Sequence, residues 1–370
     1  MQASEWYHIN DKNRLDTPAL VVYPDRVQSN INALIAMIND VTRLRPHVKT
    51  HKSDEVTQMM LRAGINKFKC ATIAEAEMLG RNQAPDVLLA YQPTLQKLER
   101  LIKLIIKYPQ TGYSCLVDNA ATAEMVNQEA EKAGLTINIY IDLNVGMDRT
   151  GIPPQEAQPL INIIADFKNL KLTGLHAYDG HIHDADYGTR REKALAALKP
   201  VLELQNALQN TGYTNLQLVC SSSPTLPILM EQHNIQCCPG TFVYWDRGYQ
   251  LAFAEQQFEP AVLVVARVIS LPAKNKVCID LGHKSVAAEN ELAKRVYFLN
   301  APELKLISQS EEHLVAETEE NHSYKIGDVL YGLPYHICPT VALYEKVITI
   351  KGSYLAGEWI TEARNRKITV

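Results

Sequence analysis

An excess of charge of either sign is missing from this sequence. Its 370 residues carry 37 Lys and Arg against 41 Asp and Glu, a formal net charge of −4 with histidine taken as neutral. No basic excess is available to neutralise the phosphates of a nucleic acid or an anionic membrane surface. We therefore expect neither nucleic acid nor membrane as a partner.

Long hydrophobic runs are also missing. The most apolar windows, residues 101–106 and 262–265, are far shorter than the roughly 20 residues that cross a bilayer. The first residues lack a basic region followed by an apolar run and a small-residue cleavage site, so we expect no signal peptide. Together these absences predict a cytoplasmic protein.

Cysteines at the spacing of metal or redox motifs are lacking as well. The seven cysteines form an odd set without Cys-X-X-Cys, which predicts free thiols in a reducing compartment. The glycine signatures of dinucleotide and P-loop sites are absent too. What is present is an ordinary globular composition, with 46% hydrophobic and 21% charged residues.

From residue 19 onward, short apolar or β-branched runs alternate with longer amphipathic stretches, the pattern of βα units and a parallel sheet. After a strand-like run at 19–23 and a helix over about 25–40, candidate strands follow at 45–50, 67–72, 86–91, 113–118, 138–143, 172–178, 216–221 and 235–238. Helical patterns separate them, for example at 94–108 and 119–134. Eight such repeats predict an α/β fold, a closed (β/α)₈ TIM-type barrel, with an open doubly wound sheet as the alternative.

The pattern changes after about residue 248. Strand-rich segments at 261–270, 277–280, 313–316, 329–331 and 341–350 are separated by turns rich in Gly, Pro, Asn and Glu. We therefore predict a barrel domain over residues 12–248. A smaller β domain is predicted over 249–370, together with residues 1–11.

Basic and imidazole side chains are concentrated at 45–52, where the first of the eight strands ends. In an extended strand, His47, Lys49 and His51 would share one face. A partly desolvated lysine beside other positive groups tends to have a lowered pKa and to become a nucleophilic amine. The alternative is a solvated basic strand end.

Other chemistry-bearing residues follow the later strands, and in a barrel these strand ends meet on one face. Arg149 lies in a glycine-flanked loop, and the segment 176–184 holds four titratable rings and two carboxylates. Hydroxyls and backbone N–H groups at 221–225 and 239–241 form the kind of phosphate cradle that this fold uses. A lysine, an arginine and a phosphate cradle together indicate pyridoxal phosphate.

At these motifs the sequence resembles the fold-type III, alanine racemase-like pyridoxal-phosphate enzymes. Within them it is most similar to the branch that contains D-threonine aldolases and D-serine dehydratases. The run Arg-Pro-His-Val-Lys-Thr-His-Lys at 45–52 resembles that branch's cofactor-lysine motif, and the resemblance covers nearly the whole chain.

The resemblance implies roles for individual residues. Lys49 would bind the cofactor covalently, Arg149 would hydrogen-bond its phenolic oxygen, and Tyr178 would lie close to the Schiff base. The residues that would hold the phosphate are Ser222, Ser223, Gly240 and Thr241. Alanine racemases place an arginine against the pyridine nitrogen at the position that is Cys238 here.

His336 and Cys338 form a His-X-Cys pair in the predicted β domain. In an extended strand both side chains point to the same face, which suits two ligands of a tetrahedral zinc ion with the other positions open. On spacing alone, the alternative is a chance buried pair. The resemblance implies a divalent metal here, zinc or manganese, since aldolases and dehydratases of the branch bind one and alanine racemases do not.

The resemblance further implies a lyase for D-3-hydroxy-α-amino acids that forms a homodimer. We favour D-threonine aldolase-type cleavage to glycine and an aldehyde, because residues 178–181 resemble the aldolases and either His181 or His183 could act as the base. The alternative is D-serine dehydratase activity, β-elimination to pyruvate and ammonia, because Cys338 resembles the dehydratases. A racemase is less favoured because it would not use the metal pair. A non-catalytic pyridoxal-phosphate-binding protein is disfavoured because it would leave the β domain without a role.

Overall fold

The computed structural model describes residues 5–370 and separates by internal contacts into two units. Unit 1 holds the chain up to residue 33, residues 50–56 and residues 241–364. Unit 2 holds residues 34–49, 57–240 and 365–370. Neither unit is one continuous stretch, and the predicted domain boundary after residue 248 stays a prediction.

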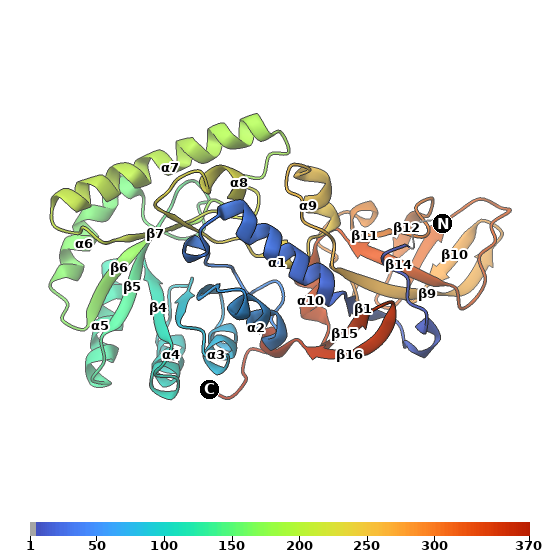
Figure 1. Ribbon diagram of the computed structural model, residues 1–370, viewed down its shortest axis with the longest axis horizontal. Coiled ribbons are helices and arrows are strands. Elements are labelled where there is room, and N and C mark those ends of the chain that lie inside the picture. The colour runs from blue at the N-terminus through green and yellow to red at the C-terminus, as the bar shows by residue number, and fades with distance from the viewer. Residues whose placement is uncertain (1–4) are drawn as a thin grey trace. The chain divides into compact units, whose positions relative to one another are not determined.

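Unit 2 contains a sheet of seven parallel strands hydrogen-bonded in sequence order. The strands are β2 (Lys67–Cys70), β3 (Asp86–Leu89), β4 (Gly112–Val117), β5 (Ile137–Leu143), β6 (Leu170–Ala177), β7 (Gln217–Cys220) and β8 (Ile235–Cys237). The helices of the repeats are α2 (Asp54–Arg62), α3 (Ile73–Arg81), α4 (Leu95–Lys107), α5 (Ala120–Lys132), α6 (Ala157–Ala165), α7 (Tyr187–Asn210) and α8 (Leu226–Leu229). Figure 1 shows α4 to α7 outside the strands β4 to β7. The sequential order excludes a doubly wound sheet, in which the strand order reverses.

Residues 44–48 close this sheet into a barrel. On the β8 side, Arg45 N–H donates to Cys237 O (2.9 Å) and His47 N–H donates to Pro239 O (3.0 Å). On the β2 side, Val48 N–H donates to Lys69 O (3.0 Å) and Lys69 N–H donates to Pro46 O (2.9 Å). The predicted barrel is therefore confirmed, but the predicted strand at 45–50 is wrong. Pro46 has no N–H to donate, and the chain turns at 48–51, so His47, Lys49 and His51 do not share a strand face.

Local sequence accounts for the repeats. Asn119 caps α5 by accepting from Thr122 N–H at 2.8 Å, as its position before the helical pattern predicts. In α4, Leu98, Leu101 and Leu104 recur at helical spacing and are buried. The helices thus present an apolar face to the sheet.

A polar network crosses the barrel interior around Arg45, whose side chain is completely buried. Its guanidinium donates to both carboxylate oxygens of Asp86 (2.6 and 2.7 Å) and its Nε donates to Gln236 Oε1 (2.8 Å). Replacing Arg45 alone would leave the partly exposed carboxylate of Asp86 and the buried amide of Gln236 without their donor, which costs free energy.

Arg45→Met should therefore lower the free energy of unfolding by about 3 kcal/mol, measured by urea unfolding. The reason is that Asp86 and Gln236 lose their donors. Lys132→Met, which removes an exposed pair with Glu129, is the control and should leave stability nearly unchanged. Equal stability of the two variants would contradict a structural role for this network.

Residues 365–370 return to unit 2 and pack beside α3 and α4. The buried carboxylate of Glu77 on α3 accepts from Thr369 N–H at 3.0 Å. Arg100 Nε on α4 donates to Val370 O at 2.9 Å. These hydrogen bonds fasten the last described residues to the barrel.

Unit 1 is built on a nine-stranded sheet. Its strands are β1 (Ala19–Val22), β9 (Val262–Ala273), β10 (Lys276–Ile279), β11 (Val296–Phe298), β12 (Lys305–Gln309), β13 (Leu314–Glu317), β14 (Val329–Pro334), β15 (Lys346–Lys351) and β16 (Tyr354–Ile360). The main path runs β12-β13-β10-β9-β1-β15-β16, and β14 pairs with β9 and β11. Only β1 and β15 are parallel. The smaller β domain expected from the sequence is confirmed.

The helices of this part of the chain are α1 (Pro24–Ile38), α9 (Arg247–Ala252) and α10 (Ile337–Leu343). The predicted strand at 341–350 is wrong in its first part, because α10 extends to Leu343 and β15 begins at Lys346. A short apolar run is compatible with a buried helix as well as a strand, so the pattern could not separate them. Among the described residues, no helix has both the length and the apolar character that crossing a bilayer requires.

Candidate active site

A cavity of about 540 Å³ opens at the carboxyl ends of the barrel strands in unit 2, within the usual size range of small-molecule sites. The cavity is lined by three of the predicted site residues, Lys49, Arg149 and Tyr178. His47, Lys69 and His176 line it as well. The structure thus brings the expected lysine, arginine and tyrosine to one place.

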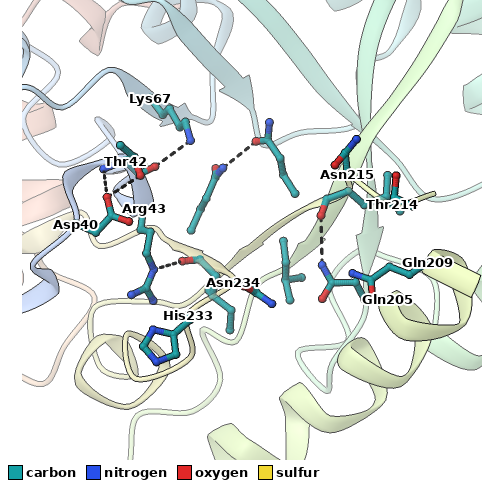
Figure 2. Close-up of a pocket in the computed structure, with 15 residues that line it drawn as sticks. Asp40, Thr42, Arg43, Lys67, Gln205, Gln209, Thr214, Asn215, His233 and Asn234 are labelled. Atoms are coloured by element: carbon teal, nitrogen blue, oxygen red, sulfur yellow. Dashed lines mark hydrogen bonds between the residues drawn. The ribbon is translucent and has the colours of Figure 1, made fainter. Parts of the chain in front are cut away.

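A second cavity, of about 520 Å³, lies at the opposite ends of the strands and is shown in Figure 2. Its cations are already engaged with backbone oxygens. Arg43 donates to the carbonyl oxygens of Met230, Gln232 and Ile235, and Lys67 Nζ donates to Thr42 O at 2.9 Å. Active sites of barrel enzymes lie at the carboxyl ends of the strands, so the first cavity is the candidate.

Lys49 lies in the turn that follows the barrel-closing segment, and its side chain is exposed at the cavity. Its backbone N–H donates to His47 Nδ1 at 3.2 Å, so the imidazole of the preceding bridge residue supports the turn. The β-bridge between His47 and Lys69 of β2 fixes the backbone just before this turn. The backbone of Lys49 is therefore held in place while its amine stays accessible.

Tyr178 follows β6 and lies between two cations. Lys69 Nζ is 4.9 Å and Arg149 Cζ is 5.0 Å from the centroid of its ring. A positive group over an aromatic face is attracted by the ring quadrupole. The tyrosine and the arginine, which come from loops after adjacent strands, are therefore in contact.

His176 is buried at the end of β6 and is bound to Asp142 through a 2.7 Å contact between Nδ1 and Oδ1. Burial, with the positive charge of Lys69, lowers the pKa of His176 to about 4. Burial alone would raise the pKa of Asp142, but its bonds to His176, Thr150 and Gln92 hold that pKa below its usual range. A neutral ring that donates from Nδ1 leaves Nε2 as an acceptor, and this buried atom has no hydrogen-bond partner among the described residues.

The expected phosphate residues are buried but do not line the cavity wall. In unit 2, Gly240 N–H donates to Ser223 Oγ at 3.3 Å and Ser222 N–H donates to Thr225 Oγ1 at 3.0 Å. Thr241 belongs to unit 1, where its hydroxyl lies 3.7 Å from Cys338 Sγ. The structure thus joins the loops after β7 and β8 by hydrogen bonds.

The two candidate bases are placed away from the cavity wall. His183 is exposed, and its neighbour Asp184 pairs with Lys193 at 2.6 Å. His181 packs against Gly146 in the loop of Arg149, where a Cβ atom at position 146 would lie 2.9 Å from His181 Nε2. The close approach of the His181 ring to the backbone therefore favours a glycine at position 146, and the φ of 113° at Gly146 favours glycine as well.

Sequence reasoning missed Lys69 and His176 as site residues. A signal existed for Lys69: it is a charged residue inside a predicted buried strand, between Phe68 and Cys70. His176 was included in the segment 176–184 but received no role. Its partner Asp142 lies on another strand, which local patterns do not reveal.

His336 and Cys338 lie at the start of a helix and not on the expected extended strand. His336 is the N-cap of α10 and Cys338 lies in its first turn. Asp246 holds this turn by accepting from Ile337 N–H at 3.1 Å. The expected shared strand face is therefore wrong, although the two side chains still contact each other across the helix start.

The surroundings of this pair suit a cation. His336 Nδ1 contacts Glu289 Oε1, and Thr50 Oγ1 lies 3.2 Å from Cys338 Sγ. Although burial lowers it, hydrogen bonding to Cys338 and Glu289 raises the pKa of His336 to about 9. An imidazole whose Nδ1 is held by a carboxylate, next to a thiol, is a donor set that zinc accepts. Within residues 5–370, no group of three or more His, Cys, Asp or Glu is placed to hold a metal ion.

Comparisons with known proteins agree with this arrangement. Residues 22–247 match the family described as alanine racemase, N-terminal domain, and residues 261–350 match the putative serine dehydratase domain. The D-threonine aldolase of Arthrobacter sp is 26% identical over 368 residues, covering 95% of this chain and 93% of that protein. The crystal structure of D-threonine aldolase from Filomicrobium marinum superposes with a TM-score of 0.88 at 24% identity, covering 98% and 99% of the two chains.

The D-threo-3-hydroxyaspartate dehydratase of Delftia sp. (strain HT23) is 24% identical over 361 residues, covering 89% of this chain and 93% of that protein. The solved structure of D-threo-3-hydroxyaspartate dehydratase from Delftia sp. HT23 superposes with a TM-score of 0.82 at 22% identity, covering 94% and 97% of the two chains. A solved D-threo-3-hydroxyaspartate dehydratase with a cysteine changed to alanine, in the metal-free form, superposes with a TM-score of 0.81. Another variant has the histidine two positions earlier changed to alanine. With its barrel matched over more than half of the sequence, the chain belongs to the alanine racemase-like pyridoxal-phosphate enzymes, in the branch of the D-threonine aldolases and D-serine dehydratases.

Proposed function

We propose that the protein is a pyridoxal-phosphate-dependent lyase for D-3-hydroxy-α-amino acids, with D-threonine aldolase-type cleavage to glycine and an aldehyde. The observation that carries this proposal is the convergence of Lys49, Arg149 and Tyr178 on one cavity at the active end of the barrel. Similarity to the Arthrobacter aldolase over 95% of the chain supports the choice of reaction. A homodimer and a cytoplasmic location stay predictions.

The residues of the cavity fit pyridoxal phosphate. Lys49 offers an accessible amine, Arg149 a cation, and His176 Nε2 a buried acceptor that awaits a partner. Lys49 would hold the cofactor covalently and Arg149 would bind its phenolic oxygen. The phosphate would be bound by Ser222, Ser223, Gly240 and Thr241. When bound, this cofactor supplies an electron sink for a bond broken at or next to Cα.

Proton transfer falls to the chain's own side chains. For aldol cleavage, a base must take the proton of the substrate's β-hydroxyl, and His181 and His183 are the proposed candidates. His181 is the better placed of the two, because it packs on the loop that carries Arg149, whereas His183 is exposed. Lys49 would take the α-proton in the alternative elimination.

His336 and Cys338 would hold the divalent metal, zinc or manganese, and Glu289 would orient the imidazole through Nδ1. A metal held by two protein ligands keeps positions open and can act as a Lewis acid on a hydroxyl group. Solved D-threo-3-hydroxyaspartate dehydratase structures include variants of a histidine and of a cysteine two positions later, the same spacing as His336 and Cys338, and the cysteine variant was solved in a metal-free form. These observations support the assignment of the pair as the metal ligands.

The same cysteine favours a second candidate, a D-serine dehydratase-type β-elimination that yields pyruvate and ammonia. The Delftia relative is a dehydratase, and the solved D-threo-3-hydroxyaspartate dehydratase variants have a cysteine two positions after a histidine, as this chain does. In that reaction the hydroxyl group leaves, so no base is needed at its oxygen. The reaction therefore does not depend on His181 or His183.

Product analysis separates the two reactions. The purified protein is incubated with pyridoxal phosphate, with and without a chelator, and separately with D-threonine and D-serine. Glycine and acetaldehyde from D-threonine are expected, and pyruvate and ammonia from D-serine would instead establish the dehydratase. The L-isomers serve as controls. No product from either substrate, or from 3-hydroxy-D-aspartate, would contradict the lyase proposal.

A further inference from the structure

Lys69 is a second lysine at the cavity, and the proposed chemistry gives it no covalent role. It lies on β2, where the alternation of the strand turns Lys67 and Lys69 to the barrel interior and Phe68 and Cys70 to the other face. Lys67 lines the cavity at the amino ends of the strands, whereas Lys69 lines the active-site cavity. The side chain of Lys69 is buried, with 4% of the residue exposed.

No hydrogen bond or ion pair of Lys69 Nζ is found within residues 5–370. This amine lies 4.9 Å from the centroid of the Tyr178 ring. Lys67, by contrast, donates to Thr42 O. The amine reaches the cavity from a largely buried position where the described part of the protein offers it no hydrogen-bond partner, so its placement indicates a partner supplied by a ligand.

The interior near Lys69 is mostly apolar. Its partner in the register with β3 is Leu88, which packs in a buried cluster with Leu116, Tyr140, Val219 and Cys238. The ionisable groups that face Lys69 from the other elements are Lys49, Asp142, His176, Asp179 and Cys238. Burial, with the charge of Lys49, lowers the pKa of Lys69. Asp142 is already bound by His176, Gln92 and Thr150, so it does not take the role of an ion-pair partner.

We propose that Lys69 is a second functional amine of the active site, which donates a hydrogen bond to an acceptor atom of the molecules that occupy the cavity. That acceptor belongs either to the ring of the bound cofactor or to the carboxylate of the amino acid substrate. The inference rests on the proposed function, because it takes these two molecules as the occupants. Lys69 would thereby supply a cationic hydrogen-bond donor. Lys49 would not supply one, because its amine would be bonded covalently to the cofactor.

Cofactor binding gives the first test. Pyridoxal phosphate is titrated into cofactor-free protein, followed by the absorbance of the bound form, for wild type and Lys69→Met. Loss of a charged hydrogen bond should weaken binding roughly tenfold to hundredfold if the acceptor is on the cofactor. Lys67→Met, on the same strand and face but at the other cavity, is the matched control and should bind as wild type does. Lys69→Gln, which keeps a polar donor without charge, replaces the methionine variant if that variant does not fold.

Substrate binding gives the second arm. D-Alanine, which lacks the β-hydroxyl group, is titrated into the cofactor-loaded proteins. Weakening by a similar factor, with cofactor binding unchanged, would assign the acceptor to the carboxylate. Binding of both molecules within twofold of wild type would overturn the proposal. If wild type itself binds no pyridoxal phosphate, the proposed function fails instead.

Thermal unfolding of the cofactor-free protein separates this role from a structural one. The amine of Lys69 reaches the open cavity, so Lys69→Met should not lower the melting temperature of the cofactor-free protein, and it should reduce the further rise that the cofactor brings. A lysine that serves the fold would give the reverse, a lower melting temperature with an unchanged cofactor effect. That result would also overturn the proposal.

Discussion

Lys49→Ala should remove the absorbance band of the lysine-bound cofactor and lower turnover by at least about 10³-fold, because this amine is the covalent anchor of the cofactor and, in the alternative elimination, also takes the α-proton. The structure supports this expectation by placing Lys49 at the cavity, on a turn whose neighbouring residues are bonded to β8 and β2. Absorbance of the purified variant and product formation from D-threonine and D-serine are the measurements.

Two controls sharpen the Lys49 experiment. Lys67→Ala removes a lysine of the same barrel whose amine is bonded to a backbone oxygen at the opposite cavity, and it should keep activity. A small primary amine added to Lys49→Ala should restore part of the turnover, because it supplies the amine that the variant lacks, whereas an unfolded variant would not respond. Full turnover without Lys49 would remove the basis of the proposed mechanism.

His336→Ala and Cys338→Ala should each remove the metal and the activity while the cofactor absorbance stays. The pair supplies the two strong ligands of the candidate metal site, so loss of either leaves a single donor. Metal affinity should therefore fall by more than the roughly 10–100-fold that follows loss of a supporting partner. Metal content after dialysis and turnover with added zinc or manganese are the readouts.

Cys278→Ala is the matched control for the metal experiment. Cys278 is a partly buried cysteine on β10 of the same unit, and its removal should leave metal content unchanged. Variants of His336 or Cys338 that retain full metal content would refute the assignment of this pair. Variants that lose metal but keep full turnover would instead refute its part in catalysis.

The barrel was predictable from sequence because its strands and helices are set by local patterns. The expected strands at 67–72, 113–118 and 235–238 match β2, β4 and β8 to within two residues at each end. The element that closes the barrel was mistaken for a regular strand, because its pairing depends on two distant edges and is interrupted by Pro46. The local sequence pattern thus identified the βα repeats but not the irregular segment at residues 44–48 that closes the barrel.

The candidate site was predictable where one short segment carries the chemistry, as at Lys49, Arg149 and Tyr178. It was not predictable where partners are far apart in sequence, as with His176 and Asp142 or His336 and Glu289. The resemblance supplied the roles of His336 and Cys338, but the sequence did not show that a helix begins there. Lys69 carried a usable signal, since a lysine within a predicted buried strand needs a partner.

The hydrogen bonds of Glu77 with residues 369 and 370 have a consequence for how the protein is made. They join positions 292 and 293 residues apart, and all of residues 241–364 lie within the loop that they close. During synthesis, unit 2 therefore cannot complete its contacts until unit 1 has been translated. Contacts between residues so far apart in sequence slow folding, and partly folded intermediates expose hydrophobic surface in the meantime. We therefore expect a folding intermediate in which most of the barrel is formed but residues 365–370 have not yet bound to it.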